Sequence, residues 1–112
     1  MLFSLTGEYT SEALNAMREN PDSGNRTEAV AKLVEAAGGK LIGVFFRIAN
    51  GPSVQVIFDV PDPQMAFAMT SVAVQSGRAQ NIKLERFFTQ EEVFQVREKV
   101  KQIRGAYRAP GT

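Results

Sequence analysis

Residues 41–60, LIGVFFRIANGPSVQVIFDV, decide the fold of this chain. They contain two runs rich in aliphatic and aromatic residues, 41–48 and 54–60, and each run predicts a β-strand. The Asn50-Gly51 pair between the runs is the strongest short-range signal for a β-hairpin. Pro52 suits the loop of that hairpin, because a proline has no N–H to donate inside a strand. We therefore expect two neighbouring antiparallel strands here.

Before the hairpin, the sequence predicts one strand and two helical pieces. Residues 3–6 alternate between apolar and polar side chains, as a half-buried strand does, and Gly7 is expected to end this strand. A helix that starts at residues 10–11 follows, because hydroxyl side chains there can cap it. The segment 20–24 has the composition of a turn, and it separates this helix from a second one at 25–37.

After the hairpin, the sequence predicts a helix, a strand and a last helix. Asp62 and Pro63 are typical of a helix start, and residues 65–74 are apolar nearly all round, so we expect this helix to be deeply buried. Residues 81–87 alternate again and predict a strand. The last helix begins with a capping box at Thr89 and carries a narrow apolar stripe. The stripe consists of Val93, Val96, Val100 and Ile103.

This order of elements is that of a ferredoxin-like βαββαβ sandwich, an α+β fold with both main helices on one face of a four-stranded antiparallel sheet. We expect residues 1–104 to form this single domain and residues 105–112 to be a flexible tail. Alternate side chains of a strand point to opposite faces, so the strand residues divide into two sets. The set expected under the helices is Phe3, Leu5, Ile42, Val44, Phe46, Ile48, Val54, Val56, Phe58, Ile82 and Leu84.

The opposite face of the predicted sheet mixes large apolar residues with charged and polar ones. An exposed apolar patch usually marks a contact surface, and the simplest partner is a second copy of the chain. We therefore expect a homodimer or a larger assembly, in which polar residues of this face could line a shared cavity. The alternative is a solvated face with scattered apolar residues. This set is Ser4, Thr6, Phe45, Arg47, Gln55, Ile57, Asp59, Lys83, Glu85 and Phe87.

Composition excludes several classes of function. The chain has no cysteine and no histidine, so it lacks thiolate nucleophiles, sulfur-based metal sites and histidine-based triads. Its 13 basic and 12 acidic residues give a net charge of +1, which offers no general attraction to nucleic acid. The sequence has neither a signal-peptide pattern nor an apolar run of membrane-spanning length. We expect a cytoplasmic protein without cofactor, metal, nucleic-acid partner or membrane contact.

The chain resembles the GYD-domain family, small bacterial proteins of the dimeric α+β barrel superfamily, over roughly residues 1–95. Four segments carry the resemblance: Tyr9-Thr10, residues 26–41, residues 58–62 (FDVPD) and residues 88–92 (FTQEE). The resemblance implies a ferredoxin-like fold and dimeric or higher assembly, but no settled reaction. Relatives in the superfamily include cofactor-free monooxygenases, muconolactone isomerases and ligand-binding regulators. The Gly-Tyr-Asp triplet that names the family should fall at the hairpin, where this chain has Asn-Gly-Pro-Ser.

Three residues are candidates for chemistry. Arg47 and Asp59 share the second sheet face, where a guanidinium could bind a carboxylate and an aspartate could act as a base. A plain salt bridge is the alternative for this pair. Tyr9 lies between the first strand and helix, where its hydroxyl could orient a ligand or bond locally. The candidate ligand-binding residues are Tyr9, Phe45, Arg47, Gln55, Ile57 and Asp59.

These observations leave three hypotheses about function. The first is a homo-oligomeric protein that binds a small organic molecule or serves as an accessory protein. The second is a cofactor-independent isomerase or monooxygenase acting on a small organic acid, with Asp59, Arg47 and Tyr9 as its catalytic candidates. The third is a structural interaction module without a ligand.

Overall fold

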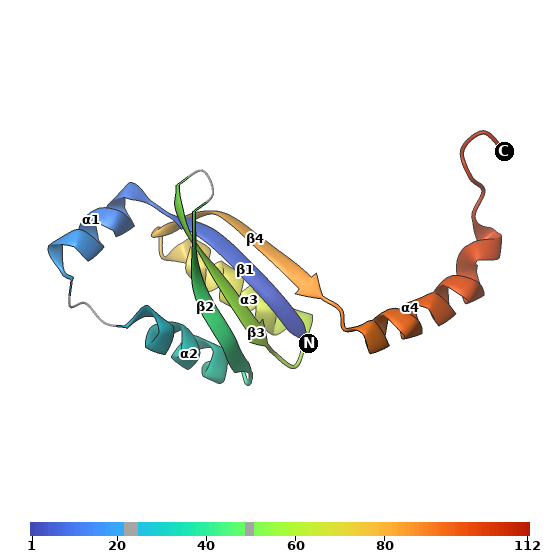
Figure 1. Ribbon diagram of the computed structural model, residues 1–112, viewed down its shortest axis with the longest axis horizontal. Coiled ribbons are helices and arrows are strands. Elements are labelled where there is room, and N and C mark those ends of the chain that lie inside the picture. The colour runs from blue at the N-terminus through green and yellow to red at the C-terminus, as the bar shows by residue number, and fades with distance from the viewer. Residues whose placement is uncertain (22–24, 49–50) are drawn as a thin grey trace.

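The computed structural model describes residues 1–21, 25–48 and 51–112, and its elements confirm the expected α+β fold (Figure 1). The expected turn residues 22–24 and Asn50 of the expected hairpin turn lie outside the described residues. In the described part, no helix is long and apolar enough to cross a membrane. The elements are β1 (Leu2–Tyr9), α1 (Ser11–Glu19), α2 (Arg26–Ala36), β2 (Lys40–Ile48), β3 (Pro52–Asp59), α3 (Pro63–Gln75), β4 (Ala79–Phe87), α4 (Gln90–Ile103) and a 3-10 turn (Arg104–Ala106).

The predicted helix caps are present. Thr10, Asn25 and Asp62 each accept a hydrogen bond from a backbone N–H two or three residues later, at 3.1, 2.9 and 2.8 Å. These bonds satisfy N–H groups that have no partner inside the first helical turn. The start of each helix is therefore fixed by a single side chain that the sequence makes visible.

The strands form one antiparallel sheet in the order β2-β3-β1-β4, so β1 and β3 are central. Helices α2 and α3 pack on the same face of this sheet and enclose the core with it. Phe58 is fully buried at the centre, and its ring stacks on that of Phe3 with centroids 5.8 Å apart. The buried core is Phe3, Val34, Ala37, Val56, Phe58, Val60, Ala66 and Met69.

The expected facing of Ile42 is wrong because β2 contains a bulge. Leu41 pairs with Phe58 and Gly43 pairs with Ile57, so Ile42 is an extra residue opposite one step of β3. Leu41 therefore packs against the core, while Ile42 is 54% exposed. Simple alternation fails here because a bulge shifts every preceding residue to the other face.

Phe46 and Ile48 also differ from expectation, because neither is covered by a helix. Their expected face is the helix-bearing one, yet they are 67% and 98% exposed at the far end of β2. The end of the edge strand thus runs past the layer of helices that covers the core.

A second bulge lies where β1 pairs with β4. Gly7 does not end β1, as expected from the sequence, but lies within it, and the pairing shifts between Thr6 and Glu8. The one extra residue is on β4, where Asn81 adopts a left-handed conformation with φ of 52°. Asparagine tolerates this conformation better than most residues. Pro52 likewise lies not in the loop but at the first position of β3, which proline can occupy.

Helices α3 and α4 expose much more apolar surface than a single core would leave. Only Ala66 and Met69 of α3 are buried, so the expectation of a deeply buried helix is wrong, and Phe67 is 71% exposed. Helix α4 has no buried residue and leads away from the sheet (Figure 1). The radius of gyration is 18.1 Å, whereas a compact chain of this length has about 13 Å.

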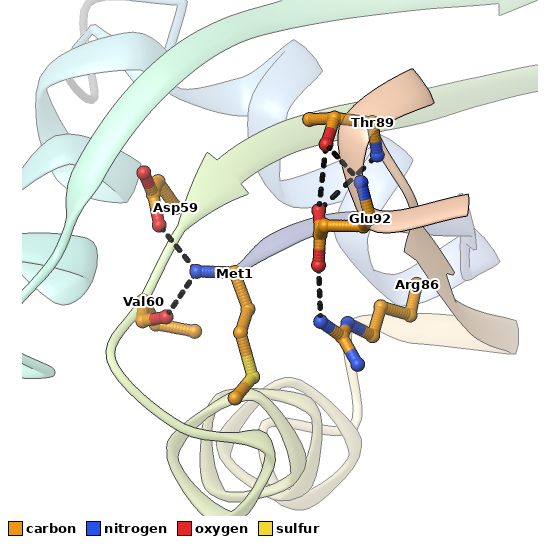
Figure 2. Close-up of polar contacts among 6 residues, drawn as sticks. All are labelled: Met1, Asp59, Val60, Arg86, Thr89 and Glu92. Carbon is orange, nitrogen blue, oxygen red and sulfur yellow. Dashed lines mark hydrogen bonds and ion pairs between the residues drawn. The ribbon is translucent and has the colours of Figure 1, made fainter. Parts of the chain in front are cut away.

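The α4 helix is held at its start by a group of polar contacts (Figure 2). Glu92 accepts hydrogen bonds from the Thr89 backbone N–H at 3.1 Å and from the Thr89 hydroxyl at 3.3 Å. Its second oxygen accepts from the Arg86 guanidinium at 2.8 Å, and that guanidinium also lies 4.2 Å from the Phe88 ring centroid. The direction in which α4 leaves the sheet is therefore set by a capping box tied to β4.

Replacing Phe58 by alanine should lower the free energy of unfolding by about 3–5 kcal/mol, because the change empties the centre of the core. Denaturant unfolding followed by circular dichroism measures this loss. The matched control is Phe46→Ala on β2. Because the Phe46 ring is 67% exposed, its loss should lower the free energy of unfolding by about 0.5 kcal/mol or less. Equal losses for the two variants would contradict the position of the core.

The hydrogen bond from the Thr89 backbone, followed by its hydroxyl and the Arg86 charge, lowers the pKa of the Glu92 carboxyl. Because folding lowers this pKa, the ionised carboxylate stabilises the start of α4 at pH values above the ordinary glutamate pKa. This stabilisation is lost as the pH falls through the lowered pKa. Carboxyl NMR should find a midpoint below that of glutamate in a peptide. Arg86→Gln should move the midpoint upward, and a midpoint at or above the peptide value would contradict the contacts in Figure 2.

Candidate functional site

The sheet face opposite the helices, called the open face here, has an apolar half. Leu2 pairs with Phe87 of β4, and Ile57 pairs with Ser4 and Gly43 on its two sides. These residues lie near the start of β1 and the end of β3. Phe87 is 38% exposed, and Leu2 and Ile57 are partly exposed.

Phe45 extends the apolar half across β2. Its ring lies against Gly43, where an added Cβ would come within 2.7 Å of the Phe45 Cε2 atom. Gly43 therefore lets a large ring lie flat on the sheet, and a side chain there would force the ring away. Phe45 remains 53% exposed, so this flat apolar surface is uncovered in the single chain.

The other half of the open face is polar and unusually well buried. Ser4, Thr6 and Ser53 are 1%, 8% and 6% exposed, although no helix covers this face. The Gln55 amide donates a hydrogen bond to the Ser4 hydroxyl at 3.0 Å, which joins β3 to β1 through side chains. The small hydroxyl side chains of the central strands β1 and β3 therefore form a depression between the longer side chains of the edge strands β2 and β4.

A hollow of about 260 Å³ lies over this polar half. Arg47 of β2 borders it on one side, and Lys83 and Glu85 of β4 border it on the other. Within the described residues, none of these three charged groups takes part in a salt bridge or a side-chain hydrogen bond. The residues that line the hollow are Thr6, Gly7, Glu8, Arg47, Ser53, Asn81, Lys83 and Glu85.

The bulge on β4 orders one border of the hollow. The Asn81 amide donates to both carboxylate oxygens of Glu8, at 2.9 and 3.2 Å. This contact holds Glu8 against β4, and it depends on the left-handed conformation that places Asn81 there. Glu8 therefore has a polar partner already, unlike Glu85.

Ser53 is the most unusual group of the hollow. Its hydroxyl oxygen is enclosed and has no hydrogen-bond partner among the described residues. Leaving a buried polar group unpaired costs about 1–3 kcal/mol, so such groups are rare in folded proteins. Ser53 faces Arg47 on β2 and Glu8 on β1, at the floor of the hollow. A rotation of the Ser53 side chain would be needed to bring this enclosed hydroxyl to a molecule in the hollow.

The structure does not bring the three catalytic candidates together. Arg47 pairs with Ser53 and Asp59 pairs with Lys40, so six residues of β3, about 20 Å, separate the two positions. Asp59 instead contacts the N-terminal ammonium at 2.7 Å (Figure 2). Tyr9 borders a different hollow of about 780 Å³, beside α1 and Arg78.

Five of the six candidate ligand-binding residues, all except Tyr9, lie on the open face, and Asp59 is at its far end beside Leu2. Phe45 and Ile57 belong to its apolar half, while Arg47 and Gln55 belong to its polar half. Ser53 was missed by the sequence argument, because β3 was expected to start at Val54 and position 53 was assigned to a loop. Moving the strand start to Pro52 continues the alternation of β3 and would have placed Ser53 on this face.

Comparison with known proteins gives one family and one related fold. The family model for the GYD domain matches residues 3–96. No curated protein matches the chain in sequence. Among solved structures, the fold is similar to 5-chloro-2-hydroxyhydroquinone dehydrochlorinase from Burkholderia phenoliruptrix AC1100, in complex with 2,5-dihydroxybenzoquinone. The TM-score is 0.55 at 12% identity, over 81% of this chain and 97% of that one.

Ser53→Ala should raise the free energy of unfolding by about 1 kcal/mol, because it removes an enclosed hydroxyl that has no partner. Thermal unfolding without added ligand measures the gain. Ser4→Ala is the matched control on β1, where a buried hydroxyl that accepts from Gln55 is lost and stability should fall. A loss of stability in Ser53→Ala would show that this hydroxyl is already satisfied.

Proposed function

This chain belongs to the GYD-domain family, and we propose that it is a homo-oligomeric protein that binds a small organic molecule on the open face of its sheet. The observation that carries the proposal is the division of this face into an apolar half and a buried polar half with a hollow. The apolar half offers a surface for a second copy. The polar half offers hydrogen-bonding groups that such a copy would shield from water.

Self-association is supported by what a single chain leaves uncovered. The open face presents Phe45 and Phe87, and α4 presents Val96, Val100 and Ile103, which are 44%, 47% and 68% exposed. Apolar patches of this kind are rarely left in water by monomeric proteins. A two-fold dimer covers the same patch on both copies, and α4 extends far enough from the sheet to contact a neighbour.

Ligand binding is supported by the hollow and by a protein of similar fold. The dehydrochlorinase described above was solved with a small ring compound bound, which indicates what this fold can accommodate. Catalysis is less well supported, because Asp59, Arg47 and Tyr9 lie in three separate places. A role for Tyr9 or Asp59 in ligand contact stays a prediction.

Ile57→Asp should convert the assembly to a monomer, because it introduces a charge into the apolar half of the open face. Sedimentation velocity at micromolar concentration measures the particle mass against 12.3 kDa for one chain. The matched control is Leu14→Asp on α1, which is 41% exposed and outside the open face, and which should leave the assembly intact. A monomeric wild-type chain would overturn the proposal.

A further inference from the structure

We propose that the hollow over the polar half binds a small hydroxylated organic acid, with its carboxylate at Arg47 and Ser53 and its hydroxyl toward Glu85. This inference rests on the proposed function and specifies the ligand class of the same face. Three unpaired charged groups and one enclosed, unpartnered hydroxyl border a single hollow. Their chemistry decides which molecule fits.

The Arg47 end of the hollow suits a carboxylate. A guanidinium presents parallel N–H donors that match the two oxygens of a carboxylate. Ser53 pairs with Arg47 across β2 and β3, so its unpartnered hydroxyl, once rotated toward the hollow, can donate to the same group. Lys83 adds a second positive charge from β4, opposite Thr6. No salt bridge within the described residues neutralises either cation.

The Glu85 end of the hollow suits a hydrogen-bond donor instead of an anion. Glu85 lies on β4 opposite Ser4, and its carboxylate has no partner in the described part of the chain. Glu8 carries the second negative charge of the lining, but it pairs with Ser53 at the Arg47 end, where Asn81 already donates to its carboxylate. At the other end, the second carboxylate of a dianion would meet the Glu85 carboxylate. A molecule with a carboxylate at one end and a hydroxyl at the other would be complementary to both ends.

The hollow has a volume of about 260 Å³, which gives room for a small ring compound such as a hydroxybenzoate. Because the hollow opens to the surface, the positions of its charged groups define the ligand class more than its volume does.

Calorimetric titration of the wild-type protein at low ionic strength tests the ligand class with three probes. 4-Hydroxybenzoate, whose carboxylate and hydroxyl lie at opposite ends of the ring, should bind about tenfold or more tightly than 4-hydroxybenzamide, which lacks the charge, and more tightly than benzoate, which lacks the hydroxyl. Equal affinity for the acid and the amide would overturn the proposal. So would the absence of binding by either acid at millimolar concentration.

Two variants locate the site. Arg47→Gln should weaken 4-hydroxybenzoate binding about tenfold, and Arg18→Gln on α1 should not change it. Ser53→Ala should weaken binding while it raises the melting temperature of the ligand-free protein, a combination that a general loss of folding cannot produce. Unchanged affinity in both Arg47→Gln and Ser53→Ala would overturn the assignment.

Sedimentation of the same samples separates this inference from the proposed function. If Arg47→Gln stays assembled and loses binding, Arg47 contacts the ligand as proposed. If Arg47→Gln falls apart into monomers, Arg47 pairs with a charge of the second copy and the ligand site is overturned. If the wild type assembles but binds neither acid, the ligand class is wrong while self-association stands.

Discussion

A four-stranded sheet has two faces, and this chain packs helices on only one of them. Helices α2 and α3 enclose Phe58 and its neighbours on that face, and this burial stabilises the domain. The opposite face must then be solvated, covered by a partner, or made of short polar side chains. Here large apolar groups, which suit a partner, occupy one half, and small hydroxyl residues occupy the other. The position of the hollow follows from this division.

The same constraint explains why so much apolar surface lies outside the core. Among the described residues, one side of α3 and the apolar stripe of α4 remain exposed, and the radius of gyration exceeds that of a compact domain of this length. Exposed apolar area on two helices as well as on the sheet favours an assembly with more than one contact surface. The capping box of Thr89 and Glu92, tied to Arg86, gives α4 a defined direction in the single chain. A fixed direction lowers the entropy cost of docking such an arm.

Most of the fold could be predicted from the sequence, because caps, turns and alternation are local signals. Thr10, Asn25, Asp62 and Thr89 cap the helices as their residue types indicate. The sheet face on which a strand residue lies is harder to predict, because a bulge reverses the face without a clear local signal, as at Ile42. Burial on α3 was overestimated for another reason: an apolar sequence shows that a surface needs a partner, but not whether the same chain supplies it. Arg47 and Asp59 were placed on one face correctly, yet register decides that they lie far apart.

Selection for stability alone would not keep the polar half of the open face, because this half contains a group that lowers the free energy of unfolding. An alanine at position 53 would leave no unpaired hydroxyl, and apolar residues in place of Arg47, Lys83 and Glu85 would extend the surface available to a second copy. Local choices that oppose folding mark functional places in proteins whose other choices are consistent. Here the enclosed Ser53 hydroxyl is such a choice, and it borders one small hollow beside an apolar half that can exclude water from it once covered. Exclusion of water strengthens each charged contact inside. The proposed assembly and the proposed ligand site would therefore share one sheet face.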